Sequence, residues 1–389
     1  MKQNKIPDYH GNSIVNLVSS ILLRFDKFSQ YPPLEILPKE IIADSTNLIF
    51  FVIDGMGSAF LEKYGKKTIF HQYLRGKITS SFPTTTAAAM LSYYTGFAPK
   101  NHGIPAWFTY IRQIGMITAI LPFNPRIKHQ SLTEYNIEPR EVYNFTSYFD
   151  DLEISQHIFM PEELNRAPLM QIINHNRTPH GFKDLDDLFQ KLDTFIQNQQ
   201  GQSNYIFVYW PELDSLAHKY GINHKKTITH LHDLNQTFEK YTLDWKAKDP
   251  FCRIIISADH GLIDIATENQ LFLEQYPILH QSLTLPLAGE GRVPFFYVRP
   301  DQLDVFKQQI EENFGNLGEL YSRQEILQSE LFGLFDLHPQ LPSRIGDFVF
   351  IFDQPYILKD QMLGEERSEM IGYHGGLSEE ELYVPFIVI

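Results

Sequence analysis

The residues of this chain that could carry out chemistry stand just after short apolar runs or in loops. They are Asp54, the threonines at 84–86, Asp214, His218, Asp259, His260 and His374. Taken singly, each has an ordinary structural explanation, such as a turn residue, a surface ion pair or a loop histidine. Ligands of open α/β sheets bind at the carboxyl ends of the strands, so together these residues predict one site.

The residue types in this set favour a metal centre. Carboxylates and imidazoles are present without a thiolate, which is a ligand mixture that suits zinc or another borderline divalent cation. Three aspartates, three histidines and a hydroxyl are enough for two metal ions. Two ions about 4 Å apart can clamp the attacking and leaving oxygens of an in-line displacement. The set therefore predicts a two-metal site.

Four apolar runs must provide the strands that position these side chains. Residues 47–53, 78–82, 205–210 and 253–258 are rich in β-branched and aromatic residues and are predicted as strands buried on both faces. Between these runs, apolar residues recur at helical spacing over 185–196 and 228–241. Such alternation predicts an α/β sheet covered by helices. An amphipathic helix is also predicted to start near Asn12 or Ser13.

The chain is predicted to form a single catalytic domain, residues 1–389, with two insertions. Residues from 105 to about 150 are rich in aromatics, Pro and Asn and show little helical period, so we expect a meander near the site. Residues from about 265 to 345 contain a strand, a helix at 302–314, a further strand and another helix. This second insertion is predicted to be a smaller α+β lobe.

The composition excludes some partners. Lys and Arg number 33 against 47 Asp and Glu, a net charge of −14, which does not suit a nucleic-acid polymer. Bound metal ions can reverse the field of a pocket, so a small anionic substrate stays compatible. Residues 14–25 lack the features of a signal peptide, and no apolar run reaches the roughly 18 residues that span a bilayer. With Cys252 as the single cysteine, we expect a cytoplasmic protein without a membrane span.

Five motifs resemble the type I phosphodiesterase/nucleotide pyrophosphatase family of the alkaline phosphatase superfamily. They are FVIDGMG at 51–57, FPTTTAAAMLSYYTGFAPKNHGI at 82–104, DSLAHKYG at 214–221, SADHG at 257–261 and YHGGLSEEELYVP at 373–385. They span most of the chain, and the agreement of five motifs in the same order argues against chance. The resemblance implies an alkaline-phosphatase-like mixed central sheet between helices, which agrees with the strands predicted above.

Carried over position by position, the resemblance implies two divalent ions, with zinc as the expected metal, and a threonine nucleophile at Thr86. The implied ligand sets are Asp214, His218 and His374 for one ion, and Asp54, Asp259, His260 and Thr86 for the other. The implied activity is that of a phosphodiesterase or nucleotide pyrophosphatase, which acts on a small phosphorylated substrate through a phosphothreonine. Metal coordination would activate the otherwise weakly nucleophilic hydroxyl.

The chain departs from the family pattern at one position near the nucleophile. Nucleotide pyrophosphatases usually carry an asparagine three residues after it, where this chain has Ala89. Arg112, Arg126 or a backbone amide at the start of the helix after Thr86 could instead contact phosphate. Each arginine is equally explained as a solvated charge on a loop.

Other functions share this architecture. A phosphomonoesterase or a phosphonate hydrolase of the same superfamily is an alternative, as is a binding module that keeps only the fold. A sulfatase is disfavoured, because residues 84–88 lack both the modifiable Cys or Ser and the arginine of such enzymes. All seven expected metal-sphere residues are present, which favours an active enzyme. The leaving group, the physiological metal and the oligomeric state stay open.

Overall fold

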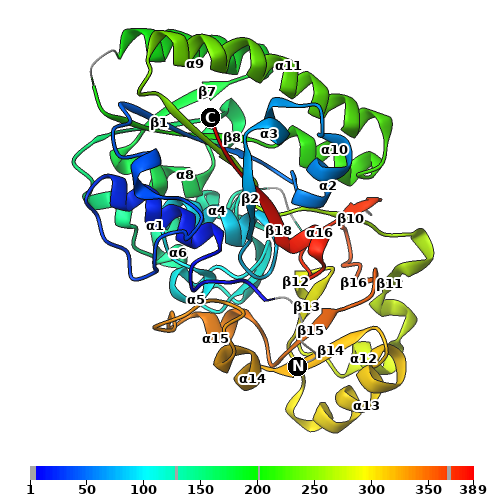
Figure 1. Ribbon diagram of the computed structural model, residues 1–389. Coiled ribbons are helices and arrows are strands. Elements are labelled where there is room, and N and C mark those ends of the chain that lie inside the picture. The colour runs from blue at the N-terminus through cyan, green and yellow to red at the C-terminus, as the bar shows by residue number, and fades with distance from the viewer. Residues whose placement is uncertain (1–5, 128–129, 200–201, 366–368) are drawn as a thin grey trace.

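A seven-stranded sheet flanked by helices forms the centre of the molecule (Figure 1). The computed structural model describes residues 6–127, 130–199, 202–365 and 369–389. The strands, in their order across the sheet, are β2 (Leu74–Thr79), β18 (Tyr383–Val388), β9 (Arg253–Ser257), β1 (Asn47–Ile53), β8 (Asn204–Trp210), β6 (Ser155–Pro161) and β7 (Thr178–Phe182).

Strand direction in this sheet brings distant segments to one edge. β1 pairs in parallel with β8 and β9, and β6 pairs in parallel with β7 and β8. β18 runs antiparallel to both of its neighbours, β2 and β9. The carboxyl ends of β1, β2, β8 and β9 therefore lie at the same edge, together with the start of β18. This mixed sheet provides the edge at which a ligand site is expected.

Consecutive residues of β1 pack against different helices. Phe50 contacts Tyr93 of α4 (Thr86–Thr95), with ring centroids 5.0 Å apart. Phe51 contacts Phe189 of α9 (Leu185–Asn198) and Phe238 of α11 (Lys225–Lys248). Side chains alternate between the two faces of a strand, so both faces of the sheet are covered. Because helices cover both faces of the sheet, every residue of β1 and β8 is buried.

Three of the four predicted strands are confirmed closely. β1 has the predicted bounds, and β8 and β9 differ from the prediction by one residue. The strand predicted at 78–82 instead spans Leu74–Thr79, and its first four residues alternate between half-buried and exposed. β2 is an edge strand, so half of its side chains face solvent, and the prediction of burial on both faces was wrong for this strand.

The helices around the central sheet include the helix that was predicted near the N-terminus. α1 (Ile14–Arg24) begins after Ser13, whose hydroxyl accepts from the Asn16 amide while the Asn16 side chain accepts from the Ser13 amide. Among the described residues, no helix combines the length and apolar character needed to cross a bilayer. The remaining helices of this region are α2 (Ser58–Tyr64), α3 (Ile69–Gln72), α5 (Pro99–His102), α6 (Pro139–Tyr143), α7 (Glu162–Asn165), α8 (Pro168–Ile173), α10 (Glu212–Tyr220) and α16 (Glu379–Leu382).

Both insertions contribute strands to a second seven-stranded sheet, seen at the bottom of Figure 1. Its order is β14 (Gly318–Ser322), β15 (Phe348–Phe352), β13 (Val293–Phe296), β12 (Ala288–Glu290), β3 (Phe108–Ile111), β4 (Met116–Ala119) and β5 (Asn124–Pro125). The join is the pairing of Gly289 in β12 with Phe108 in β3. The segments that the sequence treats as separate insertions therefore share one lobe.

Helices and two short ladders complete this lobe. The predicted succession of strand, helix, strand and helix corresponds to β13, α13 (Leu303–Phe314), β14 and α14 (Arg323–Gln328). The other elements are α12 (Pro277–Gln281), α15 (Leu341–Arg344), the ladder of β11 (Gln270–Phe272) with β16 (Ile357–Lys359), and the ladder of β10 (Ile263–Asp264) with β17 (Gly372–Tyr373).

A buried ion pair ties the lobe to the segment before β18. Arg292, between β12 and β13, donates two hydrogen bonds to Glu381, and both residues are almost completely buried. Arg292 also donates to the carbonyls of Phe352, Gln354 and Tyr356. Glu381 accepts a further hydrogen bond from the Gly376 amide at 2.7 Å. Both buried charged groups are therefore paired with each other and make further hydrogen bonds, which offset the cost of removing them from water.

We expect Arg292→Met to lower the free energy of unfolding by about 3–5 kcal/mol, because it leaves the Glu381 carboxylate buried without its partner. The measurement is urea unfolding at neutral pH. Arg299→Met is the matched control, since Arg299 pairs with Asp301 at the surface and should cost at most about 1 kcal/mol. Equal losses in the two variants would contradict this account of the ion pair.

Candidate active site

The structure brings the seven residues selected from the sequence to one edge of the central sheet. Asp54 follows β1 directly, and Thr86 is the first residue of α4. Asp259 and His260 follow β9 after one intervening residue, and Asp214 and His218 lie one turn apart in α10. His374 follows β17, so it reaches the site from the C-terminal segment.

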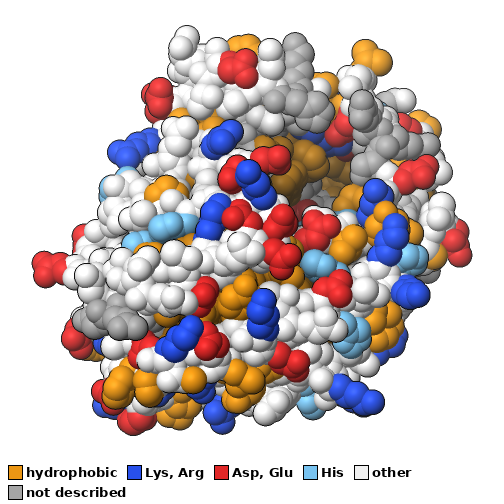
Figure 2. All heavy atoms as spheres, turned by 90° about the horizontal axis from the view of Figure 1, so that it is seen from above, with side chains coloured by type: hydrophobic (Ala, Val, Ile, Leu, Met, Phe, Trp, Pro, Cys, Tyr) orange, Lys and Arg blue, Asp and Glu red, His pale blue; other side chains and the backbone are white. Residues whose placement is uncertain are grey.

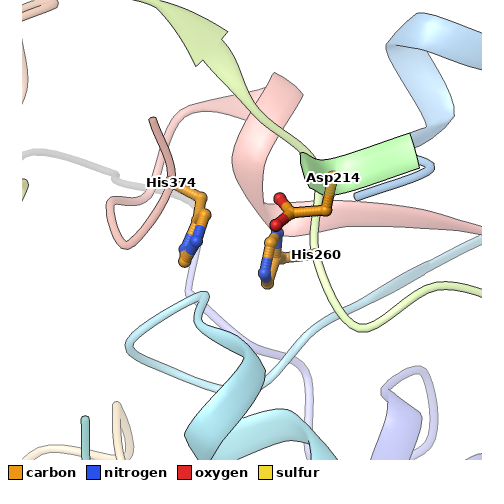
Figure 3. A group of neighbouring side chains, drawn as sticks. All are labelled: Asp214, His260 and His374. Carbon is orange, nitrogen blue, oxygen red and sulfur yellow. The ribbon is translucent and has the colours of Figure 1, made fainter. Parts of the chain in front are cut away.

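Two groups of side chains have ligand atoms close enough together to hold a metal ion. Asp54, Asp259 and His260 form one group, and Asp214, His260 and His374 form the other, with all ligand atoms of a group within 4.8 Å of one another. Figure 3 shows the second group, in which the His260 and His374 rings lie side by side below Asp214. The ring centroids of this histidine pair are 3.7 Å apart.

His218 stands beside the second group, although it is not one of the three. Its Nε2 lies 3.2 Å from Oδ2 of Asp214, and its ring centroid lies 5.1 Å from that of His374. The first group contains three of the four members of one ligand set implied by the family resemblance, the fourth being Thr86. In the second group, His260 takes the place that the resemblance gave to His218.

Each of the three aspartates has one oxygen in a polar contact. Asp54 accepts from the Tyr209 hydroxyl, Asp259 accepts from the Gly55 and His260 amides, and Oδ2 of Asp214 lies 3.2 Å from Nε2 of His218. The other oxygen of each is buried and has no hydrogen-bond partner among the residues that the structure describes. Two of these oxygens, Oδ1 of Asp54 and Oδ2 of Asp259, lie 3.6 and 3.3 Å from Nε2 of His260. A buried carboxylate oxygen without a hydrogen bond is costly, so three at one place fit a site for a cation.

The three histidines are also oriented alike. Nδ1 lies 2.8 Å from the Gly372 carbonyl in His218, 2.9 Å from the Thr84 carbonyl in His374, and 3.2 Å from the Gly261 carbonyl in His260. A carbonyl only accepts, so the proton is on Nδ1 and the lone pair of a neutral ring is on Nε2. This backbone orientation is typical of histidines that bind metals.

The pKa values of the side chains in the site are shifted in different directions. Burial raises the pKa of Asp54 well above its ordinary value, and the charges of Asp259 and Asp214 raise it further. Burial also opposes ionisation of Asp214, but the neighbouring His218 outweighs it and lowers the pKa of Asp214. Burial, with His260 and His218, lowers the pKa of His374 well below its ordinary value. Such divergence within one cluster is typical of functional sites.

Two glycines allow the loops of the site to approach one another. A Cβ on Gly261 would lie 1.9 Å from the Glu380 carbonyl oxygen, and one on Gly57 would lie 2.8 Å from the Gly261 Cα. Any side chain at Gly261 would therefore displace backbone. The glycines in the motifs around Asp54 and Asp259 thus reflect close packing of the segments after β1 and β9 with the segment before β18.

Thr86 lies where the two groups and two cavities meet. Its hydroxyl oxygen is 3.2 Å from Nε2 of His260, the residue that the two groups share. A cavity of about 490 Å³ extends from Thr86 toward the lobe, and another of about 480 Å³ extends toward α8. Trp107 and Asp214 also line both cavities. Trp107 has no signal in the sequence that distinguishes it from a core residue.

The cavity toward the lobe has charged side chains among the apolar ones of its walls and is here called the polar cavity. Arg126 lies in it but donates to both Glu365 oxygens and pairs with Asp360 at 2.7 Å. Glu290 accepts from the Trp107 amide, and burial raises its pKa to about 7. The one arginine of the lining is thus already engaged by carboxylates among the described residues.

The second candidate arginine, Arg112, and the position of the absent asparagine, Ala89, lie elsewhere. Arg112 lines a different cavity, together with Tyr297 and Arg323. Ala89 is completely buried within α4, and the described linings of the two cavities at Thr86 do not include it. The departure from the family pattern at this position therefore says little about the substrate.

Solved structures with the same fold support this view of the molecule. Murine ectonucleotide pyrophosphatase/phosphodiesterase 5 has a TM-score of 0.65 at 16% identity, with 87% of each chain covered. The human protein of the same name has a TM-score of 0.63 at 17% identity, covering 88% of this chain and 87% of its own. A third similar structure, with a TM-score of 0.63 at 16% identity and 87% of each chain covered, is an inactive variant of the murine protein in complex with AMP. The expected alkaline-phosphatase-like fold is confirmed.

Sequence comparison gives the family itself. No curated protein matches the chain. Residues 48–377 match the profile described as type I phosphodiesterase/nucleotide pyrophosphatase, and this range includes every residue of the two groups and Thr86. The chain therefore belongs to the type I phosphodiesterase/nucleotide pyrophosphatase family of metal-dependent, phosphodiesterase-type hydrolases.

Proposed function

We propose that this enzyme hydrolyses phosphodiesters with Thr86 as the nucleophile and two divalent cations as cofactors. The observation that carries the proposal is the position of the Thr86 hydroxyl, against the histidine shared by both ligand groups and at the junction of two cavities. A phosphorus atom placed there has room for an organic group on either side. This favours a diester over a monoester, which has only one such group.

The chemistry of the side chains fits divalent cations, and zinc in particular. Three buried carboxylate oxygens without hydrogen-bond partners among the described residues need positive charge. Imidazole and carboxylate ligands without thiolate suit zinc. Two cations would lower the pKa of the threonine hydroxyl and of water and would neutralise charge on the transferring group.

The proposed ligand sets combine the groups in the structure with the family resemblance. Asp54, Asp259 and His260, with Thr86, would hold one ion. Asp214 and His374 would hold the other, with His218 as the third ligand, since its Nε2 faces Asp214. His260 stands between the two sets. Asp54 is further oriented by the Tyr209 hydroxyl, whose hydrogen bond leaves the second Asp54 oxygen for the ion.

The reaction has two displacements at phosphorus. The Thr86 oxygen attacks, the bond from phosphorus to one ester oxygen breaks, and that group leaves as an alcohol with the proton from threonine. The remaining group stays on a phosphothreonine ester. Water then attacks phosphorus, releases a phosphomonoester and returns the proton to Thr86. Thr86 is the first residue of α4, so the amides at the start of this helix would stabilise negative charge on the transferring group.

Removal of the nucleophile tests its role. We expect Thr86→Ala to lower kcat for bis-p-nitrophenyl phosphate by about 10³-fold or more in zinc-loaded protein, while unfolding stays close to wild type. Thr95→Ala is the matched control, because it removes the same groups at the other end of α4. The assignment of Thr86 would be wrong if the first variant kept a wild-type rate.

The diester preference is checked in the same assay with p-nitrophenyl phosphate. The account predicts a higher kcat/KM for the diester, since both cavities can be filled. A higher value for the monoester would move the assignment to a phosphomonoesterase.

Zinc should also stabilise the folded protein, independently of catalysis. Binding to the native state alone adds about 2.7 kcal/mol at a concentration of 100 times Kd, so chelator-treated protein should gain several degrees in Tm on titration with zinc. Asp259→Asn should reduce this gain, because it removes a charge that faces the ion. Asp301→Asn, at an exposed aspartate, serves as the control. A Tm that zinc leaves unchanged in wild type would contradict the metal site.

A further inference from the structure

The cavity that extends from Thr86 toward α8 differs in character from the polar cavity. Its inner walls are nearly buried apolar side chains from α4, β6 and α8. They include three of the eight methionines of the chain: Met90, Met160 and Met170. We call it the apolar cavity. Methionine is flexible and polarisable, so such walls adapt to flat rings and to chains alike.

The apolar cavity has few charged groups in its lining, and its other polar groups are the Trp107 indole and the hydroxyls of Thr86, Tyr94, Tyr209 and Ser215. At the inner end, Asp54 and Asp214 belong to the proposed metal site, and the Tyr209 hydroxyl is already used by Asp54. At the mouth, Glu163 and Arg166 are exposed, beside Leu164 with 39% of its surface accessible. Figure 2 shows a hollow on one face of the molecule, with hydrophobic side chains inside it and charged side chains around it.

The scarcity of polar groups in the walls of the apolar cavity limits which ligand groups can bind there favourably. A nucleobase carries several hydrogen-bonding atoms on its edges, and burying them against methionine and leucine leaves them unpaired. Each polar atom that is buried without a partner costs free energy, so a lining with few polar groups disfavours a nucleobase. An aliphatic or aromatic group loses no hydrogen bond on entry and gains from burial of its surface. A volume of about 480 Å³ also suits a small-molecule group.

We propose that the apolar cavity binds an apolar ester group of the substrate, an alkyl chain or a plain aromatic ring, in preference to a nucleoside. This rests on the proposed function, because it places the phosphorus at Thr86. The enzyme is then a phosphodiesterase for diesters in which one of the two alcohols is apolar. The second ester group extends into the polar cavity, whose walls carry Glu290, Asp360 and Glu365.

Competitive inhibition by phosphomonoesters tests this inference. The zinc-loaded enzyme hydrolyses bis-p-nitrophenyl phosphate in the presence of methyl, propyl, hexyl or phenyl phosphate, or of AMP. Affinity should rise by up to about fourfold for each added methylene of the alkyl series. Hexyl phosphate and phenyl phosphate should both bind more tightly than AMP, and their ratio shows whether a chain or a ring fits better.

Variants locate the effect within the cavity. Met170→Gln places a polar amide in the inner wall at nearly constant volume, and should lower affinity for hexyl phosphate by about tenfold. Leu164→Gln tests the mouth at an exposed position that tolerates polar residues, with a smaller loss in the same direction. Met116→Gln is the matched control, because Met116 is 44% exposed on β4, in the second sheet. It should leave all five inhibition constants unchanged.

The outcomes separate this inference from the function on which it rests. Normal diester turnover with AMP bound more tightly than hexyl phosphate would overturn the apolar cavity but keep the phosphodiesterase. Inhibition constants that do not change with chain length would do the same. Failure of the wild-type enzyme to hydrolyse any diester would reject the proposed function, and the inference with it.

Discussion

Three buried aspartates at one edge of a sheet are the constraint on which the rest of the site depends. Like charges this close cannot all ionise without a cation, and burial removes the water that would otherwise screen them. Asp54 and Asp259 each accept hydrogen bonds at one oxygen, and one oxygen of Asp214 faces His218, while the second oxygen of all three has no hydrogen bond from any described residue. The histidines complete the same pattern, because each gives its Nδ1 proton to a backbone carbonyl.

Residues of the lobe and of the segment after residue 105 form part of the walls of both cavities at this charged edge. The sheet of the lobe joins strands from two distant segments through the pairing of Gly289 with Phe108, and this places Trp107 between the two cavities. The Arg292–Glu381 pair then fixes the lobe to the segment that carries His374. The same segment thus contacts the lobe, whose residues line the cavities, and contributes a ligand to the proposed metal site.

Much of this site could be predicted because the signals are local. Apolar runs mark β1, β8 and β9, and parallel strands bring the residues that follow them to one edge. β2 was misplaced, because an edge strand alternates and lacks a continuous apolar run. The role of Trp107 and the engagement of Arg126 by Glu365 and Asp360 depend on contacts between distant segments. No periodicity or motif near those residues encodes such contacts.

The central claim is that Thr86 carries the transferred group during turnover. The most direct measurement is rapid acid quenching of the zinc-loaded enzyme with bis-p-nitrophenyl phosphate, followed by mass spectrometry of the peptide that contains residues 84–95. The account predicts a transient nitrophenylphosphoryl adduct on Thr86, which forms and decays at rates that match turnover. Turnover at a normal rate with the peptide unmodified at every quench time would instead mean that water attacks phosphorus directly.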